Sequence, residues 1–252
     1  MKILVIGAAG WQGRALLANL VGRHTVRAFD QSMDAWNVWA DVDGEWDGER
    51  LSGDIADFDA VHAATDGMDG IIHLAAYFGN KDNDPLPWMI NVKGIFNVLE
   101  SARRRSIEHV VHMGSCQVAH PDGKTFFTAD VRRPDATVYG LTKRLQEETC
   151  RAFHANYGMR IIVLRPALIV DTRIALTRDR KKLGPDGWAA TKDCVCRHDL
   201  AEACRLAVES DSIDFDIFHI VGAPEAEKTC DVARSREVLG LEYKGNLEKY
   251  MG

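Results

Sequence analysis

The stretch that decides the fold is MKILVIGAAGWQG, residues 1–13. A short apolar strand runs into Gly7, Gly10 and Gly13, and leucines at helical spacing follow. Gly7 permits a tight turn, Gly10 lets the backbone approach a pyrophosphate, and Gly13 lets the helix pack on the strand. The N–H groups at the start of the helix would bind the phosphates. The stretch therefore predicts a dinucleotide site, although a glycine-rich turn that binds no nucleotide also fits the glycines alone.

The residues after the second predicted strand indicate which dinucleotide is bound. This strand ends beside Asp30, whose carboxylate can accept hydrogen bonds from both hydroxyls of an adenosine ribose. The next three residues, 31–33, offer no cation for a 2′-phosphate, and the Asp30 carboxylate would repel one. NAD is therefore favoured over NADP as the cofactor, with Trp11 and Gln12 of the turn also in contact with it.

The rest of the chain alternates apolar runs with amphipathic stretches, which is the pattern of βαβ units. The runs are apolar on both faces, as in a parallel sheet with helices on each side. The sequence therefore predicts an α/β fold, a Rossmann-like doubly wound parallel sheet. Strands are expected at 2–6, 25–29, near Leu51, and at 70–75, 108–113, 160–165 and 216–221, and helices at 11–21, 57–66, 86–104, 137–156, 199–209 and 231–239.

Two segments lack a clear period, residues 31–50 with three tryptophans and the polar residues 171–197, and both are expected to be irregular. The helix over 86–104 is expected to turn six apolar side chains inward, those of Ile90, Val92, Ile95, Phe96, Val98 and Leu99. We expect residues 1–165 to form an NAD-binding core and 166–252 to form a small substrate-binding lobe packed on the same body.

Composition excludes several classes of function. The 252 residues carry a formal net charge of −6, which argues against a general nucleic-acid binder. The N-terminus is expected to be a strand and not an export signal, and no apolar run suggests a membrane span, so a cytoplasmic location is expected. The six scattered cysteines are expected to be free thiols. Cys194 and Cys196 invite a zinc reading, but no partner follows at ligand spacing, so no metal is predicted.

Three residues form the candidate catalytic group. Tyr139 and Lys143 are four residues apart on a predicted helix, so their side chains project from one face. A neighbouring ammonium and a positive nicotinamide ring both favour the phenolate, which would let Tyr139 act as a general base. Lys143 would also hold the nicotinamide ribose. Ser115 follows the strand at 108–113, where its hydroxyl can bond a substrate oxygen. As plain helix surface, Tyr139 and Lys143 would instead be an exposed ring and a solvated charge.

With these residues the chain resembles the extended short-chain dehydrogenases/reductases of the NAD-dependent epimerase/dehydratase family over nearly its whole length. The resemblance is carried by the glycine turn, HLAA at 73–76, NVKGIFNVLE at 91–100, Arg165-Pro166 and HDLA at 198–201. It implies that Asp54 contacts the adenine and that the segment at 73–76 lies along the cofactor. The cofactor contacts that it adds are Asp54, Ile55, Leu74, Ala75, Ala76 and Asn91, together with Tyr139 and Lys143.

The chain departs from the family in two places. Met113-Gly114-Ser115 stands where the family often has consecutive small hydroxyl residues, so the proton path can differ. The part after Arg165 is shorter than in members that handle nucleotide sugars, and this compact lobe is similar to that of uronate dehydrogenases. That resemblance implies a sugar acid as substrate.

Candidate substrate contacts lie after the strands and in a basic segment. Arg173, Arg178 and the cations at 180–182 belong to a segment expected to cover the substrate, where a guanidinium could bind a carboxylate. A solvated loop explains the same charges. The candidate substrate residues are Tyr77, Ser115, Gln117, Arg173 and Arg178, with Asn80 and Trp88 as further pocket candidates, although Trp88 fits core packing equally well.

Three hypotheses follow. The first is a dehydrogenase that oxidises a hydroxyl of a sugar or sugar acid and passes the hydride to NAD. The second is a redox-neutral epimerase or dehydratase that returns the hydride to its substrate. The third is a dinucleotide-sensing protein without activity. The family resemblance also implies a homodimer through the helices at 86–104 and 137–156.

Overall fold

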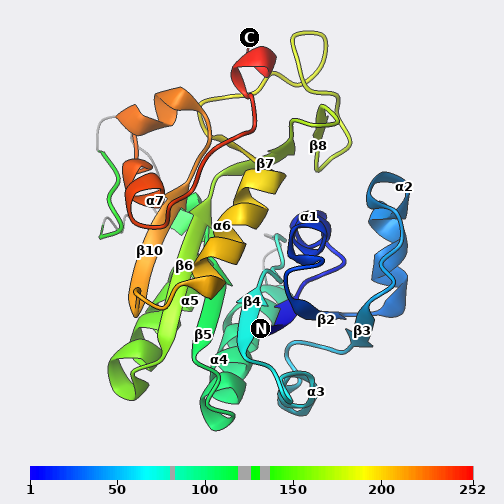
Figure 1. Ribbon diagram of the computed structural model, residues 1–252, viewed down its shortest axis with the longest axis vertical. Helices are drawn as coiled ribbons and strands as arrows, with labels where there is room; N and C mark the ends of the chain where they lie inside the picture. The colour runs from blue at the N-terminus through cyan, green and yellow to red at the C-terminus, as the bar shows by residue number, and fades with distance from the viewer. Residues whose placement is uncertain (80–82, 119–125, 131–136, 252) are drawn as a thin grey trace.

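The computed structural model describes residues 1–79, 83–118, 126–130 and 137–251. Its centre is a seven-stranded sheet in the order β10-β6-β5-β4-β1-β2-β3, in which every neighbouring pair is parallel (Figure 1). The strands are β1 (Lys2–Ile6), β2 (Thr25–Asp30), β3 (Glu49–Ser52), β4 (Gly70–His73), β5 (His109–Met113), β6 (Arg160–Pro166) and β10 (Phe215–Ile220). The predicted doubly wound parallel sheet is confirmed.

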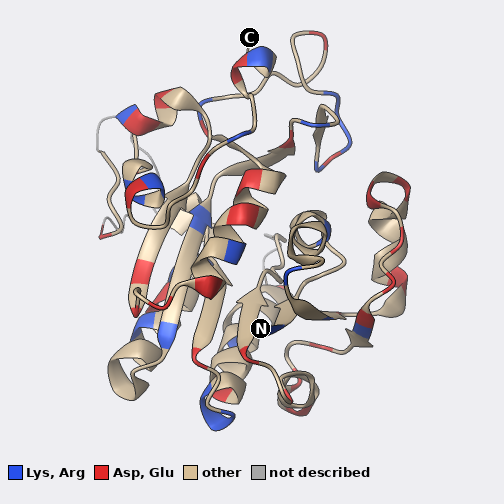
Figure 2. Cartoon of the chain, viewed as in Figure 1, with Lys and Arg blue, Asp and Glu red and all other residues tan. Residues whose placement is uncertain are grey.

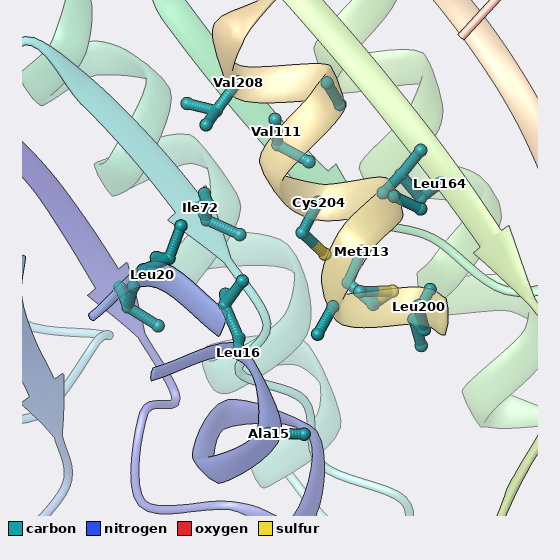
Figure 3. Packing of buried hydrophobic residues seen from close by; sticks show 14 of the residues in the cluster. Ala15, Leu16, Leu20, Ile72, Val111, Met113, Leu164, Leu200, Cys204 and Val208 are labelled. Atoms are coloured by element: carbon teal, nitrogen blue, oxygen red, sulfur yellow. The ribbon is translucent and has the colours of Figure 1, made fainter. Parts of the chain in front are cut away.

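Two helices cover one face of this sheet. They are α1 (Trp11–Leu20) and α6 (Arg197–Glu209), which pack side by side. Figure 3 shows Leu16 and Leu20 of α1 facing Cys204 and Val208 of α6 above the strand residue Ile72. All five side chains are fully buried. Because neither helix could bury its apolar stripe alone, the sheet and the two helices form one core layer.

The opposite face carries α3 (Phe58–Ala64), α4 (Gly94–Arg104) and α5 (Val138–Tyr157). Val61, Val98 and Phe153, one from each helix, join a second buried cluster with the strand residues beneath them. The helices on both faces leave the carboxyl ends of the strands open at one edge, which is where ligands bind in folds of this kind.

A small sheet extends the molecule beyond β6. It is formed by β7 (Leu168–Asp171), β8 (Leu176–Thr177) and β9 (Cys194–Cys196) in the order β8-β7-β9. The chain after Arg165 also supplies α6 and β10 to the central sheet layers, besides η4 (Pro224–Lys228), α7 (Ala233–Glu237) and η5 (Glu248–Tyr250). The boundary at 165/166 and the division of roles between the two parts stay predictions.

The expectation of irregular structure over 31–50 was wrong for its first part. Residues 33–43 form a 3-10 helix, η1 (Met33–Trp39), followed by the short helix α2 (Ala40–Asp43). Trp36 and Trp39 are buried, and the Trp39 ring lies 4.5 Å from that of Trp11. Burial of two large rings against the first helix stabilises a segment whose own sequence shows no period. The 171–197 stretch likewise contains β8 and β9.

The helix expected over 86–104 differs in two respects. It begins with a π-helical segment, η2 (Pro87–Lys93), before the α-helical α4. Within α4 the buried residues Ile95, Val98 and Leu99 follow ordinary helical spacing, which leaves Phe96 on the outer side with 50% of its surface exposed. Trp88 is also exposed. Their expected roles as an inward-facing and a pocket-lining residue are therefore wrong. The last helix is also shorter than expected, because α7 covers only five residues.

None of the six cysteines forms a disulfide bond, as predicted. Within the described ranges, no helix combines the length and the apolar character that crossing a membrane requires. Among the same residues, no group of three His, Cys, Asp or Glu side chains is placed to hold a metal ion.

Candidate active site

A cleft of about 1500 Å³ runs along the carboxyl edge of the central sheet. One end lies beside the residues that follow β1, β2 and β3, and the other extends past β5 and β6 to β10. The cleft brings together most of the predicted site residues, namely Gly7, Gly10, Trp11, Gln12, Gly13, Asp30, Asp54, Ile55, Leu74, Ala75, Ala76, Tyr77, Ser115, Gln117, Tyr139, Lys143 and Arg178.

The glycine turn has no room for side chains. Gly7 has a φ of +84°, and a Cβ on it would lie 2.7 Å from the backbone nitrogen of Ala75. A Cβ on Gly13 would lie 2.3 Å from the carbonyl oxygen of Gly7. The turn leads into α1, whose N-terminus has no side-chain cap. The first N–H groups of a helix lack partners within the helix, so this end fits the pyrophosphate of a dinucleotide.

Asp30 lies at the adenosine end of the cleft. One carboxylate oxygen accepts a hydrogen bond from the backbone N–H of Ala9 at 2.8 Å, and the other accepts one from Gln31 at 2.8 Å. Burial raises the pKa of Asp30, and these two hydrogen bonds act to lower it. Each oxygen keeps a further lone pair, so the carboxylate can still accept bonds from ribose hydroxyls. Asp54 and Ile55 line the same end of the cleft.

Asn91 lies behind the cleft wall, fully buried, and not on the cleft surface. Its side-chain oxygen accepts from the backbone N–H of Tyr77 at 2.7 Å, and its amide nitrogen donates to the Tyr77 carbonyl at 2.9 Å and to Thr142 Oγ1 at 3.0 Å. Asn91 therefore ties the segment after β4 to α5. Asn91 was predicted to contact the cofactor. In this structure its hydrogen bonds hold residues that line the cleft.

Ser115, Tyr139 and Lys143 converge in the middle of the cleft. Thr137 caps α5 by accepting a hydrogen bond from Gly140 N–H at 3.0 Å, which places Tyr139 in the first turn of the helix. Lys143, one turn later, is 1% exposed and donates to the Met113 carbonyl oxygen at 2.8 Å, while its Nζ lies 5.8 Å from the centre of the Tyr139 ring. The end of β5 and the start of α5 thus bring the three side chains together.

Burial shifts both titratable groups toward their neutral forms. It raises the pKa of Tyr139 to about 12, against a hydrogen bond with Ser115 that lowers it. It lowers the pKa of Lys143 to about 7, against the Glu147 carboxylate that raises it. A positive nicotinamide ring beside Tyr139 would favour the phenolate. The surroundings of both side chains in the protein therefore favour their neutral forms.

An aromatic and cationic stack lies over Tyr139. The Phe78 ring stacks on the Tyr139 ring at 5.0 Å, and the guanidinium of Arg178 lies 4.5 Å from the centre of the Phe78 ring. Phe78 and Arg178 both line the cleft. Arg173 lies outside the cleft, although the side chains of both arginines are exposed. The predicted pocket residue Asn80 falls outside the described residues.

Sequence reasoning missed several cleft residues, including Phe78, Trp188, Lys192 and His219. Phe78 lies in the segment that follows β4, and His219 stands near the end of β10, so the rule that ligands bind at the carboxyl ends of strands could have identified both. Trp188 and Lys192 lie in the stretch between β8 and β9, which carries no periodic signal.

Arg180 joins the two walls of the cleft. Its guanidinium donates to both carboxylate oxygens of Asp41 at 2.7 and 3.0 Å and to the Val38 carbonyl at 2.6 Å, and it lies over the Trp39 ring at 4.6 Å. Val38 and Trp39 line the cofactor side of the cleft, and the residues on each side of Arg180 line the substrate side. Figure 2 shows the acidic positions of α2 and the basic positions around β8.

We expect Asp30→Asn to weaken NAD binding about 10- to 100-fold, because a hydrogen bond to a charged group contributes about 1.5–3 kcal/mol and tenfold corresponds to about 1.4 kcal/mol. Quenching of tryptophan fluorescence would measure the dissociation constant, since Trp11 and Trp39 line the cleft. Asp34→Asn is the matched control, because Asp34 is an exposed acid on η1. Unchanged NAD affinity in Asp30→Asn would remove Asp30 from the cofactor site.

Residues 3–183 match the family model described as the NAD dependent epimerase/dehydratase family. The uronate dehydrogenase of Pseudomonas syringae pv. tomato is 28% identical over 167 residues, which cover 65% of this chain and 58% of that protein. The 3 beta-hydroxysteroid dehydrogenase/Delta 5-->4-isomerase of Mycobacterium tuberculosis (strain H37Rv) is 30% identical over 178 residues, 66% of this chain and 46% of that protein. The matches thus span about half the length of these relatives.

Solved structures share the fold. Uronate dehydrogenase from Agrobacterium tumefaciens aligns with a TM-score of 0.76 at 23% identity, covering 98% of this chain and 85% of that one. UDP-glucose 4-epimerase from Brucella ovis, in complex with NAD, aligns with a TM-score of 0.78 at 20% identity, covering 99% and 96%. The family match covers most of the chain, and the strand–turn–helix unit fits the dinucleotide that the family name specifies. The chain therefore belongs to the NAD-dependent epimerase/dehydratase family, as its sequence predicted.

Proposed function

We propose that the protein is an NAD-dependent dehydrogenase that oxidises a hydroxyl of a sugar or sugar acid, as a uronate dehydrogenase does. The observation that carries the proposal is the placement of a cation beside the catalytic group, because Arg178 stacks on Phe78 and Phe78 stacks on Tyr139. A guanidinium at that position can bind a substrate carboxylate while the hydroxyl to be oxidised lies at Tyr139.

The residues of the site have separate tasks. The glycine turn and Asp30 would hold NAD, which when bound supplies the hydride acceptor. Ser115 donates a hydrogen bond to the substrate oxygen, and Tyr139 accepts the proton of the substrate hydroxyl as the carbon gives up its hydride. Lys143, in its charged form, stabilises the phenolate and holds the nicotinamide ribose. The substrate thus loses one hydride and one proton and becomes a carbonyl compound.

The test is NADH formation from the purified protein, NAD and a panel of D-glucuronate, D-galacturonate, D-glucose and D-galactose, followed by absorbance. We expect a sugar acid to react. Arg178→Gln should then raise KM for that acid about 10- to 100-fold, because a charge-assisted contact is lost. Arg173→Gln is the matched control from the same basic segment, outside the cleft. An unchanged KM in Arg178→Gln, or a preference for neutral sugars, would contradict the anchor.

A redox-neutral epimerase or dehydratase is the second candidate, and one observation favours it. The contacts of Arg180 with Asp41 and Val38 tie the two walls of the cleft together beside the cofactor site. Such a closure would slow cofactor exchange, which an enzyme that regenerates its NAD in every turnover tolerates. NAD that copurifies with the protein, with isomerised sugar and no net NADH, would favour this candidate over the dehydrogenase.

We further propose that two copies pair through α4 and α5, as the family resemblance implies. The rings of Phe96 on α4 and Phe153 on α5 lie 5.7 Å apart, and these two helices together with η2 carry exposed apolar side chains. They are Trp88, Met89, Phe96, Leu141, Leu145 and Tyr157. We expect the wild type to sediment as a dimer and Phe96→Glu as a monomer, with Val21→Glu at the end of α1 as the control. A monomeric wild type at micromolar concentration would reject the pairing.

A further inference from the structure

His219 is a buried residue at the end of the cleft that the proposed reaction does not use. It lies next to last in β10, in register with Arg165 of β6, and only 3% of its surface is exposed. It nevertheless lines the cleft. β10 and β5 are two strand spacings apart in the sheet, and Ser115 follows the end of β5. At about 4.8 Å per strand, His219 therefore lies about 10 Å from Ser115 along the sheet edge.

Arg165 determines which nitrogen of the His219 ring carries the proton. The guanidinium is fully buried and donates to both carboxylate oxygens of Glu147 at 2.7 Å and to the Ala129 carbonyl at 3.1 Å. Its remaining nitrogen, Nη1, lies 3.4 Å from Nε2 of His219. A guanidinium can only donate hydrogen bonds, so Nε2 must accept and cannot carry a proton. The imidazole is therefore neutral, with its proton on Nδ1.

Nδ1 is the part of the ring that remains available. Among the described residues, Nδ1 has no hydrogen-bond partner. It is not one of the fully buried atoms without a partner, so part of its surface is open. Since the residue lines the cleft, this nitrogen faces it. Burial and the neighbouring Arg165 charge lower the pKa of His219 to about 3, in agreement with a neutral ring.

Apolar side chains form part of the wall beside His219, and Lys192 and Asp193 line the cleft near Cys230. Cys116, Phe127, Val221 and Cys230 line this end of the cleft and belong to one hydrophobic cluster. The hydroxyl of Thr229, which also lines it, donates to the Ala226 carbonyl. A hydrogen-bond donor in an apolar wall discriminates strongly between ligands, because a ligand without a matching acceptor leaves that donor unpaired.

We propose that His219 is a specificity-determining residue whose Nδ1–H donates to an oxygen of the substrate, at the end remote from the hydroxyl that reacts at Tyr139. This inference rests on the proposed function. It restricts the substrate to a compact molecule, about as long as one sugar ring with its substituent, that presents an acceptor oxygen there. Glu147 and Arg165 act as positioning residues, since they hold the ring in the form that donates into the cleft.

Nitrogen-15 NMR of the nine histidine rings tests the tautomer without any substrate. Loss of one ring signal in His219→Asn assigns the residue. Long-range proton–nitrogen correlations should show a neutral ring protonated at Nδ1, in the NAD-loaded protein as in the free one. A proton on Nε2, or a charged ring at neutral pH, would overturn the proposal whether or not the protein is a dehydrogenase.

Kinetics test the contact with whichever of D-glucuronate and D-galacturonate the wild type oxidises. His219→Leu, which has no donor, should raise KM about 10- to 100-fold and change kcat only a few-fold. His219→Asn should recover most of this loss, because its amide nitrogen occupies the same position along the side chain as Nδ1. Tryptophan fluorescence should show that both variants bind NAD like the wild type. Equal KM values for the wild type and the Leu variant would reject the contact, whereas a wild type that forms no NADH would reject the proposed function.

Discussion

Replacing Tyr139 by Phe is expected to lower kcat by about 10²- to 10⁴-fold, the usual contribution of a positioned general base. The substitution removes one oxygen and leaves the ring that stacks on Phe78. NAD binding should persist, because the glycine turn and Asp30 are untouched. Single-turnover formation of NADH, with the substrate that the panel identifies, would measure the loss.

Tyr157→Phe is the matched control, since Tyr157 ends the same helix with 55% of its surface exposed. It should retain full activity. In the wild type, the rate should rise with pH as the Tyr139 hydroxyl ionises, and this dependence should vanish in the residual activity of Tyr139→Phe. A Phe variant with more than a tenth of the wild-type kcat would show that another group accepts the proton.

The sequence was sufficient for the parts of the fold that repeat a simple pattern. The strand at residues 2–6, the helix at 11–21 and the helix at 137–156 were each placed within a residue or two of β1, α1 and α5. Apolar strands buried on both faces and helices with one apolar stripe leave little choice of architecture. The family match and the parallel strand order confirm that interpretation.

The errors occurred where tertiary contacts override local pattern. Residues 33–43 are helical because Trp36 and Trp39 bury their rings against the first helix and Arg180 binds Asp41, none of which a local period reveals. Phe96 faces outward because Ile95, Val98 and Leu99, at ordinary helical spacing, form the inner face of α4, and this helix is preceded by the π-helical segment η2. Such an insertion has no compositional signal, so the periodic reading of 86–104 could not detect it.

The site residues likewise divide into those that the sequence could predict and those whose position depends on tertiary structure. Ser115 and Tyr139 could be predicted because each stands at a strand or helix end whose chemistry is recognisable. The position of Arg178 in the cleft and of Arg173 outside it depends on the path of the loop around β8, and both residues are equally basic in sequence. His219 stands near the end of a predicted strand, but its contact with Arg165 depends on the pairing of β10 with β6, which the sequence does not reveal.

A layer of titratable side chains lies buried between the sheet and α5. His73 on β4 and His112 on β5 lie side by side, with their Nδ1 atoms 3.1 Å apart, so one donates and the other accepts. Burial lowers the pKa of both rings; His73 lowers that of His112 further, and the Lys143 charge lowers both. Lys143 thus has neutral rings as neighbours, and the protein holds several histidines in a form that acid would charge.

We therefore expect stability to fall steeply as the pH drops below about 6.5. His73 and His219 each have a pKa of about 3 in the folded protein, against 6.5 ordinarily. Above 6.5 both states hold neutral rings, whereas below it only the unfolded chain binds the two protons. Each proton costs about 1.36 kcal/mol per pH unit, so the pair lowers the free energy of unfolding by about 4 kcal/mol between pH 6.5 and about 5. His112 adds to this loss, since its pKa is also lowered.

Urea unfolding at several pH values between about 7 and about 5 would measure the slope, which gives the number of protons bound on unfolding. His219→Asn should reduce that number by about one, because one buried ring no longer titrates. Ile217→Val, on the same strand, is the control: it should cost about 0.5–1.5 kcal/mol at every pH and leave the slope unchanged. A wild-type slope near zero over this interval would contradict the low pKa values of the buried rings, and with them the neutral form assigned to His219.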